Sequence, residues 1–332
     1  MRMTDLSTSY MGLKLRNPII VGSSELTDTL SGIQRAEEAG AAAVVLKSFF
    51  EEQFAAEVSP EERGSFFYAE AMDYLERGGL LEYATRNKVK LIEEAKEKVS
   101  IPVIASINCQ TSRLWPRFAR HFEKAGADGL ELNVYFLPYK LEIPGAEYEK
   151  SHLQILEEVR KSVSIPVSMK LCSSLTALPY LSKKLADAGC QGLVYFNWFL
   201  HPDIDLASLK TQNVIGQGDF YQTLRWVALC AGRVGCDLAA SGGVKQSEDV
   251  AKLILAGAAA VQVVSLFLRQ GLKALSSLLE GIESWMEKHG FQSVEEFRGA
   301  LSWKRLELDF PEPKQVEAYF RSQYIQSFLK WA

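Results

Sequence analysis

Polar and charged residues stand at the ends of several short apolar segments of the chain, where they are able to bind a ligand or transfer a proton. Two lysines are the most unusual of them: Lys47 follows the segment 42–46, and Lys170 lies within the segment 166–171. A buried ammonium needs a partner, and an anionic ligand facing both lysines would supply one. The alternative is that each lysine reaches solvent where its segment ends. The other polar residues at such positions are Ser48, Ser106, Asn108, Glu131, Asn133 and Asn197.

A phosphate site is indicated further along the chain by Ser241-Gly242-Gly243, which ends an apolar segment and precedes a helical pattern. Backbone N–H groups that no side chain covers are well placed to bind phosphate at the start of a helix. Ser265 ends the next apolar segment. The chain contains no GxSxG, HExxH or GxxxxGK[ST] sequence, so a serine hydrolase, a zinc protease and a P-loop nucleotide site lose their usual support.

Short apolar segments alternate with amphipathic ones, and this alternation predicts the elements that position these residues. Continuously apolar segments are typical of strands buried on both faces of a parallel sheet. Eight such strands predict an α/β fold, the (β/α)8 TIM barrel, in which the carboxyl ends of the strands form one active-site face. A doubly wound open sheet is the alternative, although no GxGxxG follows the first strand. The expected strands are 18–21, 42–46, 102–107, 129–134, 166–171, 192–196, 237–240 and 259–264, and the expected helices are 33–39, 88–99, 115–125, 148–163, 178–188, 221–231, 247–256 and 271–289.

The barrel is expected to span residues 1–301 as one domain, with a long insertion at 48–86 after the second strand. A connection of that length is either a lid or binding loop, or a surface excursion, and the sequence leaves both open. Residues 302–332 form a C-terminal extension, in which apolar side chains at four-residue spacing predict an amphipathic helix. That helix packs on its own barrel or forms a subunit contact. The spaced side chains are Val316, Phe320, Tyr324 and Phe328.

Composition excludes several classes of protein. The 332 residues are 47% hydrophobic and 23% charged, which is typical of a globular chain and excludes a disordered or fibrous one. The net charge of −4 gives no bulk attraction for nucleic acid or for an anionic membrane. The longest apolar stretch, 253–268, is too short and too interrupted to span a bilayer. The 5 cysteines lack CxxC spacing and the N-terminus lacks the apolar centre of a signal peptide, so we expect reduced thiols, no metal site and a cytoplasmic protein.

Several segments together resemble the class 1 dihydroorotate dehydrogenase family, whose members are FMN-dependent (β/α)8 barrels. The resemblance extends from about Leu6 to Leu301. It implies the same barrel, FMN as the cofactor, and the oxidation of a CH–CH bond in pyrimidine biosynthesis. The matching segments are DLSTSYMGLKLRNPIIVGSS, AGAAAVVLKS, ADGLELN, IPVSMKL, DLAASGGVKQSEDVAKLILAGAAAVQVVS and KHGFQSVEEFRG.

The resemblance implies an FMN site at the strand ends. Gly22 and Ser23 would line the flavin ring through their backbone, and Lys47 would contact the flavin and act on the substrate side. Lys170 would lie beside flavin N1 and O2, where a cation stabilises the charge of the reduced flavin. The residues that would hold the phosphate are Gly242, Gly243 and Ser265.

The substrate half of the site departs from the family pattern. Asn133 and Asn197 are kept, and the resemblance implies that both bind substrate and that Asn133 also reaches the flavin edge. The family places a catalytic Cys, or a Ser in its class 2 relatives, in the loop after the fourth strand, where this chain has Phe136. Pro138 falls near the position of the loop Asn, and Trp198 stands where a Ser is expected. Since a phenyl ring cannot take a proton, the sequence supports FMN binding better than dihydroorotate oxidation.

Three functions stay open on the sequence alone. The first is an FMN-dependent oxidoreductase, in which Tyr135 is either a substitute acid/base or only a packing aromatic. The second is a catalytically silent FMN-binding barrel, and the third is a phosphate-binding lyase with Lys47 or Lys170 as its Schiff-base amine. The expected partners are a small-molecule substrate and a second copy of the chain. Because the chain has no NAD fingerprint of its own, an NAD-linked partner subunit also stays open.

Overall fold

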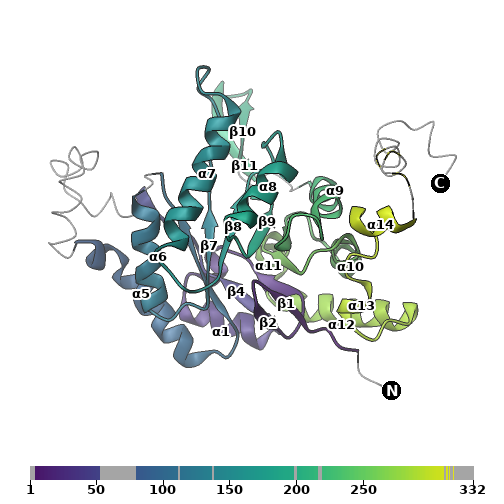
Figure 1. Ribbon diagram of the computed structural model, residues 1–332. Coiled ribbons are helices and arrows are strands. Elements are labelled where there is room, and N and C mark those ends of the chain that lie inside the picture. The colour runs from purple at the N-terminus through teal and green to yellow at the C-terminus, as the bar shows by residue number, and fades with distance from the viewer. Residues whose placement is uncertain are drawn as a thin grey trace.

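The computed structural model in Figure 1 describes residues 4–52, 80–110, 113–136, 138–197, 200–215 and 219–309, together with 312, 314 and 317. Within these residues, eight parallel strands form a closed ring in chain order, and the first strand of the ring pairs with the last. This ring confirms the predicted (β/α)8 barrel. Its strands are β3 (Ile19–Val21), β4 (Ala43–Val45), β6 (Val103–Asn108), β7 (Gly129–Asn133), β8 (Val167–Leu171), β9 (Gly192–Tyr195), β12 (Asp237–Ser241) and β13 (Ala260–Val263).

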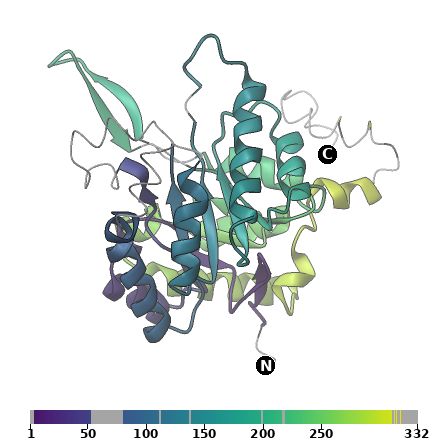
Figure 2. The same ribbon diagram turned by 60° about the vertical axis from the view of Figure 1, so that its left-hand side comes forward.

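Helices pack around the outside of the ring, as Figure 2 shows from a second direction. In α6, the buried side chains include Leu114, Trp115, Phe118 and Phe122, which fall on one face at the helical period and pack against the strands. The eight predicted helices are all found. They are α1 (Leu30–Glu38), α5 (Leu80–Lys98), α6 (Leu114–Lys124), α7 (Gly145–Arg160), α8 (Leu178–Asp187), α9 (Phe220–Cys230), α10 (Ser247–Ala256) and α12 (Ala274–His289).

Two antiparallel hairpins add to the alternating pattern, and the sequence analysis predicted neither. The hairpin of β1 (Thr8–Tyr10) and β2 (Leu13–Leu15) precedes the barrel, and the hairpin of β10 (Leu200–Asp205) and β11 (Lys210–Ile215) follows β9. The second hairpin projects from the barrel in Figure 2. The remaining short elements are η1 (Glu25–Thr27), β5 (Phe49–Phe50), α11 (Ser265–Gln270), α13 (Val294–Phe297) and α14 (Trp303–Asp309).

The β1–β2 hairpin packs against the amino-terminal end of the ring. Tyr10 and Met11 are buried there, and a Cβ at Gly192 would lie 2.7 Å from Met11 Cγ and 2.8 Å from the Tyr10 hydroxyl. The Met11 N–H also donates to Asp237 Oδ2 at 2.9 Å. These contacts cover this end of the barrel, so a ligand reaches the interior from the carboxyl end.

Most of the predicted insertion and of the C-terminal extension lies outside the described residues. Residues 53–79 of the insertion and the four spaced apolar residues of the extension are among those not described, as is Trp198. The described part of the extension forms α14. Across the described parts of the chain, no helix has the length and apolar character needed to cross a membrane.

Candidate active site

A chain of hydroxyl and amide groups crosses the carboxyl ends of five strands. Ser48 is at its centre: its Oγ lies 3.2 Å from Ser23 Oγ and 2.8 Å from Ser106 Oγ. Asn133 Nδ2 donates to Ser48 Oγ at 3.4 Å, and Asn197 Nδ2 donates to Asn133 Oδ1. Residues that the sequence placed at separate strand ends therefore meet in the mouth of the barrel.

A second polar cluster, formed by Lys170, Glu131 and Gln262, occupies the interior of the ring. Lys170 Nζ donates to Gln262 Oε1 at 3.1 Å and lies 3.9 Å from Glu131 Oε1, while Gln262 Nε2 donates to Glu131 Oε2. Lys170 is 7% exposed, and Glu131 and Gln262 are each 1% exposed. Glu131 Oε1 itself accepts no hydrogen bond from any described residue. The cluster thus holds a buried ion pair bridged by one amide.

Gly22 lies next to this cluster. A Cβ at Gly22 would lie 2.8 Å from Val264 Cγ2 and 3.6 Å from Gln262 Oε1. Gln262 is therefore a common neighbour of Gly22 and Lys170, two residues predicted to contact the same flavin. Since a Cβ at this position would crowd Val264, the close packing favours glycine here.

Lys47 has different surroundings from Lys170. Its ammonium lies 3.6 Å from Glu25 Oε1 and 3.5 Å from Asp28 Oδ2, and its side chain is 32% exposed. Lys88 Nζ donates to Asp28 Oδ1 at 3.0 Å, and burial lowers the pKa of that lysine while Asp28 opposes the change. In the described residues, Lys47 thus belongs to an ion cluster with η1 and α5, and no contact joins it to Lys170.

The predicted phosphate loop has bare backbone groups at Gly242 and Gly243. Neither N–H has a hydrogen-bond acceptor among the described residues. The following helix, α10, begins only at Ser247, and Asp249 Oδ2 caps its start by accepting from the N–H groups of Lys245 and Gln246. The free donors therefore lie in the loop itself, before the helix.

Gly243 is required by the backbone at this position. Its φ is +77°, and a Cβ would lie 2.8 Å from Phe220 Cα. We expect Gly243→Ala to lower the free energy of unfolding by about 2 kcal/mol, because both the left-handed conformation and the close backbone contact are costly. Chemical denaturation measures this change. Gly145→Ala, at a position with no atom within 4 Å of the added Cβ, is the control and should change stability little.

The loop after β7 carries the two aromatic residues that the sequence singled out. Tyr135 is 36% exposed. The Phe136 ring packs toward α7, with its centroid 5.2 Å from that of His152 and 6.2 Å from that of Tyr148. His152 is buried, and this burial lowers the pKa of its imidazole, while its hydrogen bond with the Tyr148 backbone opposes the change. Phe136 is thus a packing residue on the helix layer.

Sequence reasoning missed Gln262 and the role of Glu131 as its partner. Gln262 is one of the polar residues that interrupt the apolar stretch 253–268. The available signal was its position: a long amide in the middle of a strand with buried neighbours needs hydrogen-bond partners inside the barrel. Glu131 gave the same signal, as a carboxylate within the fully buried strand β7.

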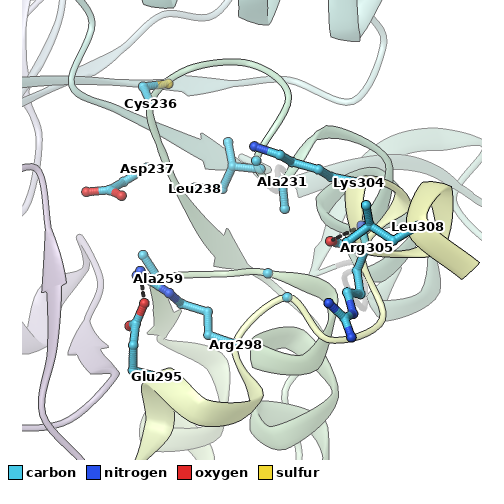
Figure 3. Close-up of a pocket in the computed structure, with 14 residues that line it drawn as sticks. Ala231, Cys236, Asp237, Leu238, Ala259, Glu295, Arg298, Lys304, Arg305 and Leu308 are labelled. Atoms are coloured by element: carbon cyan, nitrogen blue, oxygen red, sulfur yellow. Dashed lines mark hydrogen bonds and ion pairs between the residues drawn. The ribbon is translucent and has the colours of Figure 1, made fainter.

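A pocket of about 410 Å³ lies at the opposite, amino-terminal end of the strands (Figure 3). Its lining includes Asp237, Glu295 and Arg298, and Arg298 donates to Glu295 at 2.7 Å. Burial raises the pKa of the Asp237 carboxyl, while the Met11 N–H and Arg298 oppose the rise. None of the residues predicted to bind flavin or substrate lines this pocket.

The sequence model of the dihydroorotate dehydrogenase family matches residues 5–286. A protein of Aeropyrum pernix provisionally named dihydroorotate dehydrogenase A (fumarate) is 29% identical over 304 residues, which cover 89% of this chain and 97% of that protein. The catalytic subunit of dihydroorotate dehydrogenase B (NAD(+)) of Methanothermobacter thermautotrophicus is 27% identical over 308 residues, covering 89% and 97%. The corresponding subunit of Methanopyrus kandleri is 31% identical over 281 residues, covering 77% and 83%. With a closed barrel of the expected kind and a family match over most of its length, the chain belongs to the dihydroorotate dehydrogenase family of oxidoreductases.

Proposed function

We propose that the protein is an FMN-dependent oxidoreductase that oxidises a CH–CH bond in a small substrate and uses dihydroorotate poorly. The observation that carries this proposal is the position of Lys170, a buried ammonium in the barrel interior whose acceptor, Gln262, is also a neighbour of Gly22. A fixed cation at this place is suited to an electron-rich ring that gains negative charge on reduction.

The residues present fit FMN in the chemistry of their donors. Lys170 uses one N–H on Gln262 and has two more for a ligand. The N–H groups of Gly242 and Gly243 are free among the described residues, which suits the single phosphate of FMN. In this proposal Gly22 and Ser23 lie along the ring, and Ser265 adds a hydroxyl at the phosphate.

When bound, FMN would supply the acceptor for the hydride that leaves the substrate. The chain's own residues have three tasks around it. Lys170 stabilises negative charge next to the ring, and Lys47, on the substrate side, remains a candidate catalytic residue. Asn133 and Asn197 fix each other's amide by their hydrogen bond. In this proposal the remaining donors and acceptors of these two amides bind the polar edge of the substrate.

The substrate is where this chain is expected to differ from its relatives. The names of those relatives give dihydroorotate as their substrate. Oxidation of a CH–CH bond needs a base to take a proton from one carbon as hydride leaves the other. Phe136 offers no such group and packs against α7, whereas Tyr135, on the same loop, carries an ionisable hydroxyl. We therefore propose Tyr135 as the acid/base for a substrate other than dihydroorotate.

An electron acceptor also belongs to the proposal. Relatives of similar length are named as catalytic subunits of NAD(+)-dependent enzymes. A separate subunit would supply NAD(+) chemistry that this sequence lacks, so we propose such a partner alongside a homodimer of the chain. Copurification from the native host, followed by mass determination, tests both.

A Schiff-base lyase that uses Lys47 or Lys170 as its amine is less well supported than the flavin enzyme. An amine nucleophile must lose its proton, yet Lys170 faces Glu131 and Lys47 faces Glu25 and Asp28. Each lysine is therefore one half of an ion pair, which does not suit the nucleophile of a Schiff-base mechanism.

The purified protein is expected to be yellow and to release FMN, not FAD, when it is denatured. The proposed site has one phosphate cradle, at Gly242, Gly243 and Ser265, and no second one for an adenylate. Chromatography of the supernatant against FMN and FAD standards identifies the flavin. Reconstitution of apoprotein with each flavin is the control, and a protein that takes up only FAD, or neither, contradicts the proposal.

A further inference from the structure

We propose that Glu131 is a positioning residue that sets the reduction potential of the bound flavin through Lys170. The inference rests on the proposed FMN site and deepens it. Glu131 and Lys170 come from the neighbouring strands β7 and β8, and Gln262 comes from β13, on another part of the ring. The cluster therefore ties the proposed flavin contact to two further strands.

The hydrogen bonds fix the direction of every group in the cluster. The carbonyl of Gln262 accepts from Lys170 at 3.1 Å, and the amide N–H of the same side chain donates to Glu131 Oε2. Rotating the Gln262 amide by half a turn would face its NH2 toward an ammonium and its carbonyl toward a carboxylate. Both contacts would be repulsive, so the amide has one orientation, and Lys170 is held by it.

Glu131 acts on Lys170 mainly through its charge. The two groups are 3.9 Å apart, which is within ion-pair range but longer than a hydrogen bond. Both are almost completely buried, so solvent screens this interaction little. Tyr10, which packs beneath the same interior, has its pKa raised first by burial and then by the Glu131 carboxylate. The field of Glu131 thus reaches neighbouring groups inside the ring.

The sign of the effect on a flavin follows from these charges. Lys170 favours the reduced, more negative ring, and Glu131 opposes it. The pair has a net charge near zero, so the flavin meets less positive potential than Lys170 alone would provide. Removing the charge of Glu131 while keeping its shape leaves the lysine uncompensated, and the reduced form becomes more stable.

Glu131→Gln in the FMN-loaded protein is the test, because glutamine keeps a carbonyl that accepts from Gln262. We expect the Kd of oxidised FMN divided by that of reduced FMN to rise about tenfold, equal to about 30 mV upward in a two-electron midpoint potential. Dye-coupled anaerobic titration measures the potential. Glu131→Asp keeps the charge but no longer reaches Gln262, so its midpoint potential should equal that of the wild type. A purely structural role of Glu131 would shift the potentials of both variants alike.

Asp128→Asn is the matched control. Asp128 precedes β7 and pairs with Lys96 Nζ at 2.7 Å, outside the Glu131 cluster. Its replacement removes a partly buried paired carboxylate and should lower stability while leaving the potential unchanged. A wild-type protein that binds no FMN overturns the proposed function and this inference together. If the wild-type protein binds FMN but the midpoint potential of Glu131→Gln is equal to or below that of the wild type, this inference alone is overturned.

Discussion

Lys170→Ala is expected to raise the Kd for FMN about 30-fold, close to 2 kcal/mol, and to lower the potential of the flavin that still binds. The substitution removes the ammonium beside the proposed ring site. It also leaves Glu131, 1% exposed, without its counter-charge. Breaking a buried ion pair in this way costs about 3–5 kcal/mol of stability, so a lower melting temperature should accompany the loss of affinity.

The measurement is fluorescence titration of apoprotein with FMN, together with a dye-coupled potential. Lys183→Ala is the matched control, since Lys183 is an exposed lysine on α8 that pairs only with Asp187 among the described residues. It changes the net charge equally and should leave both affinity and potential at wild-type values. A Lys170→Ala protein with unchanged affinity and potential removes this lysine from the site.

Dihydroorotate is expected to reduce the flavin of the wild-type protein very slowly. Loss of a general base costs about 10²–10⁴-fold in rate, and the family resemblance implies that Phe136 stands at the position of the base and that part of the amide set for the pyrimidine ring is missing. Anaerobic stopped-flow bleaching measures the rate, with a relative that keeps the base as reference. Bleaching at the rate of that relative would contradict this prediction and show that the protein oxidises dihydroorotate as its relative does.

Phe136→Cys alone is expected to restore little of this rate. The Phe136 ring packs toward His152 and Tyr148 of α7, so a cysteine introduced there starts from a position facing the helix layer. Phe136→Leu has a comparable packing change and no thiol, and it should bleach as slowly as the cysteine variant. Once an anaerobic screen has found a substrate, Tyr135→Phe should abolish its oxidation if Tyr135 is the substitute acid/base.

The barrel could be predicted from the sequence because its strands are almost uninterrupted apolar segments. In β3 and β4 every residue is both apolar and buried, so the pattern of burial and the pattern of residue types coincide. The β10–β11 hairpin could not be found in this way. Its strands are largely exposed and carry Asp203, Asp205 and Lys210, so no apolar alternation marks them.

For the site, the sequence predicted where the polar residues lie but not which of them become partners. Polar residues at strand ends indicated the mouth of the barrel, where Ser48 contacts Ser23, Ser106 and Asn133, and Asn197 joins through Asn133. The partner of each lysine could not be read from the sequence, because it depends on which strand ends become neighbours. Lys170 contacts a carboxylate and an amide inside the ring, whereas Lys47 pairs with two exposed carboxylates.

The closure of the ring between β3 and β13 has a consequence for synthesis of the chain on the ribosome. The pairing of Ile19 with Val261 joins residues from opposite ends of the barrel sequence. Until β13 has emerged, β3 has an unpaired edge, and such edges invite pairing with other chains. Contacts so distant in sequence also form slowly. The nascent barrel is therefore most exposed to aggregation late in translation, and a chaperone that covers the β3 edge during that interval would raise the yield of closed barrels.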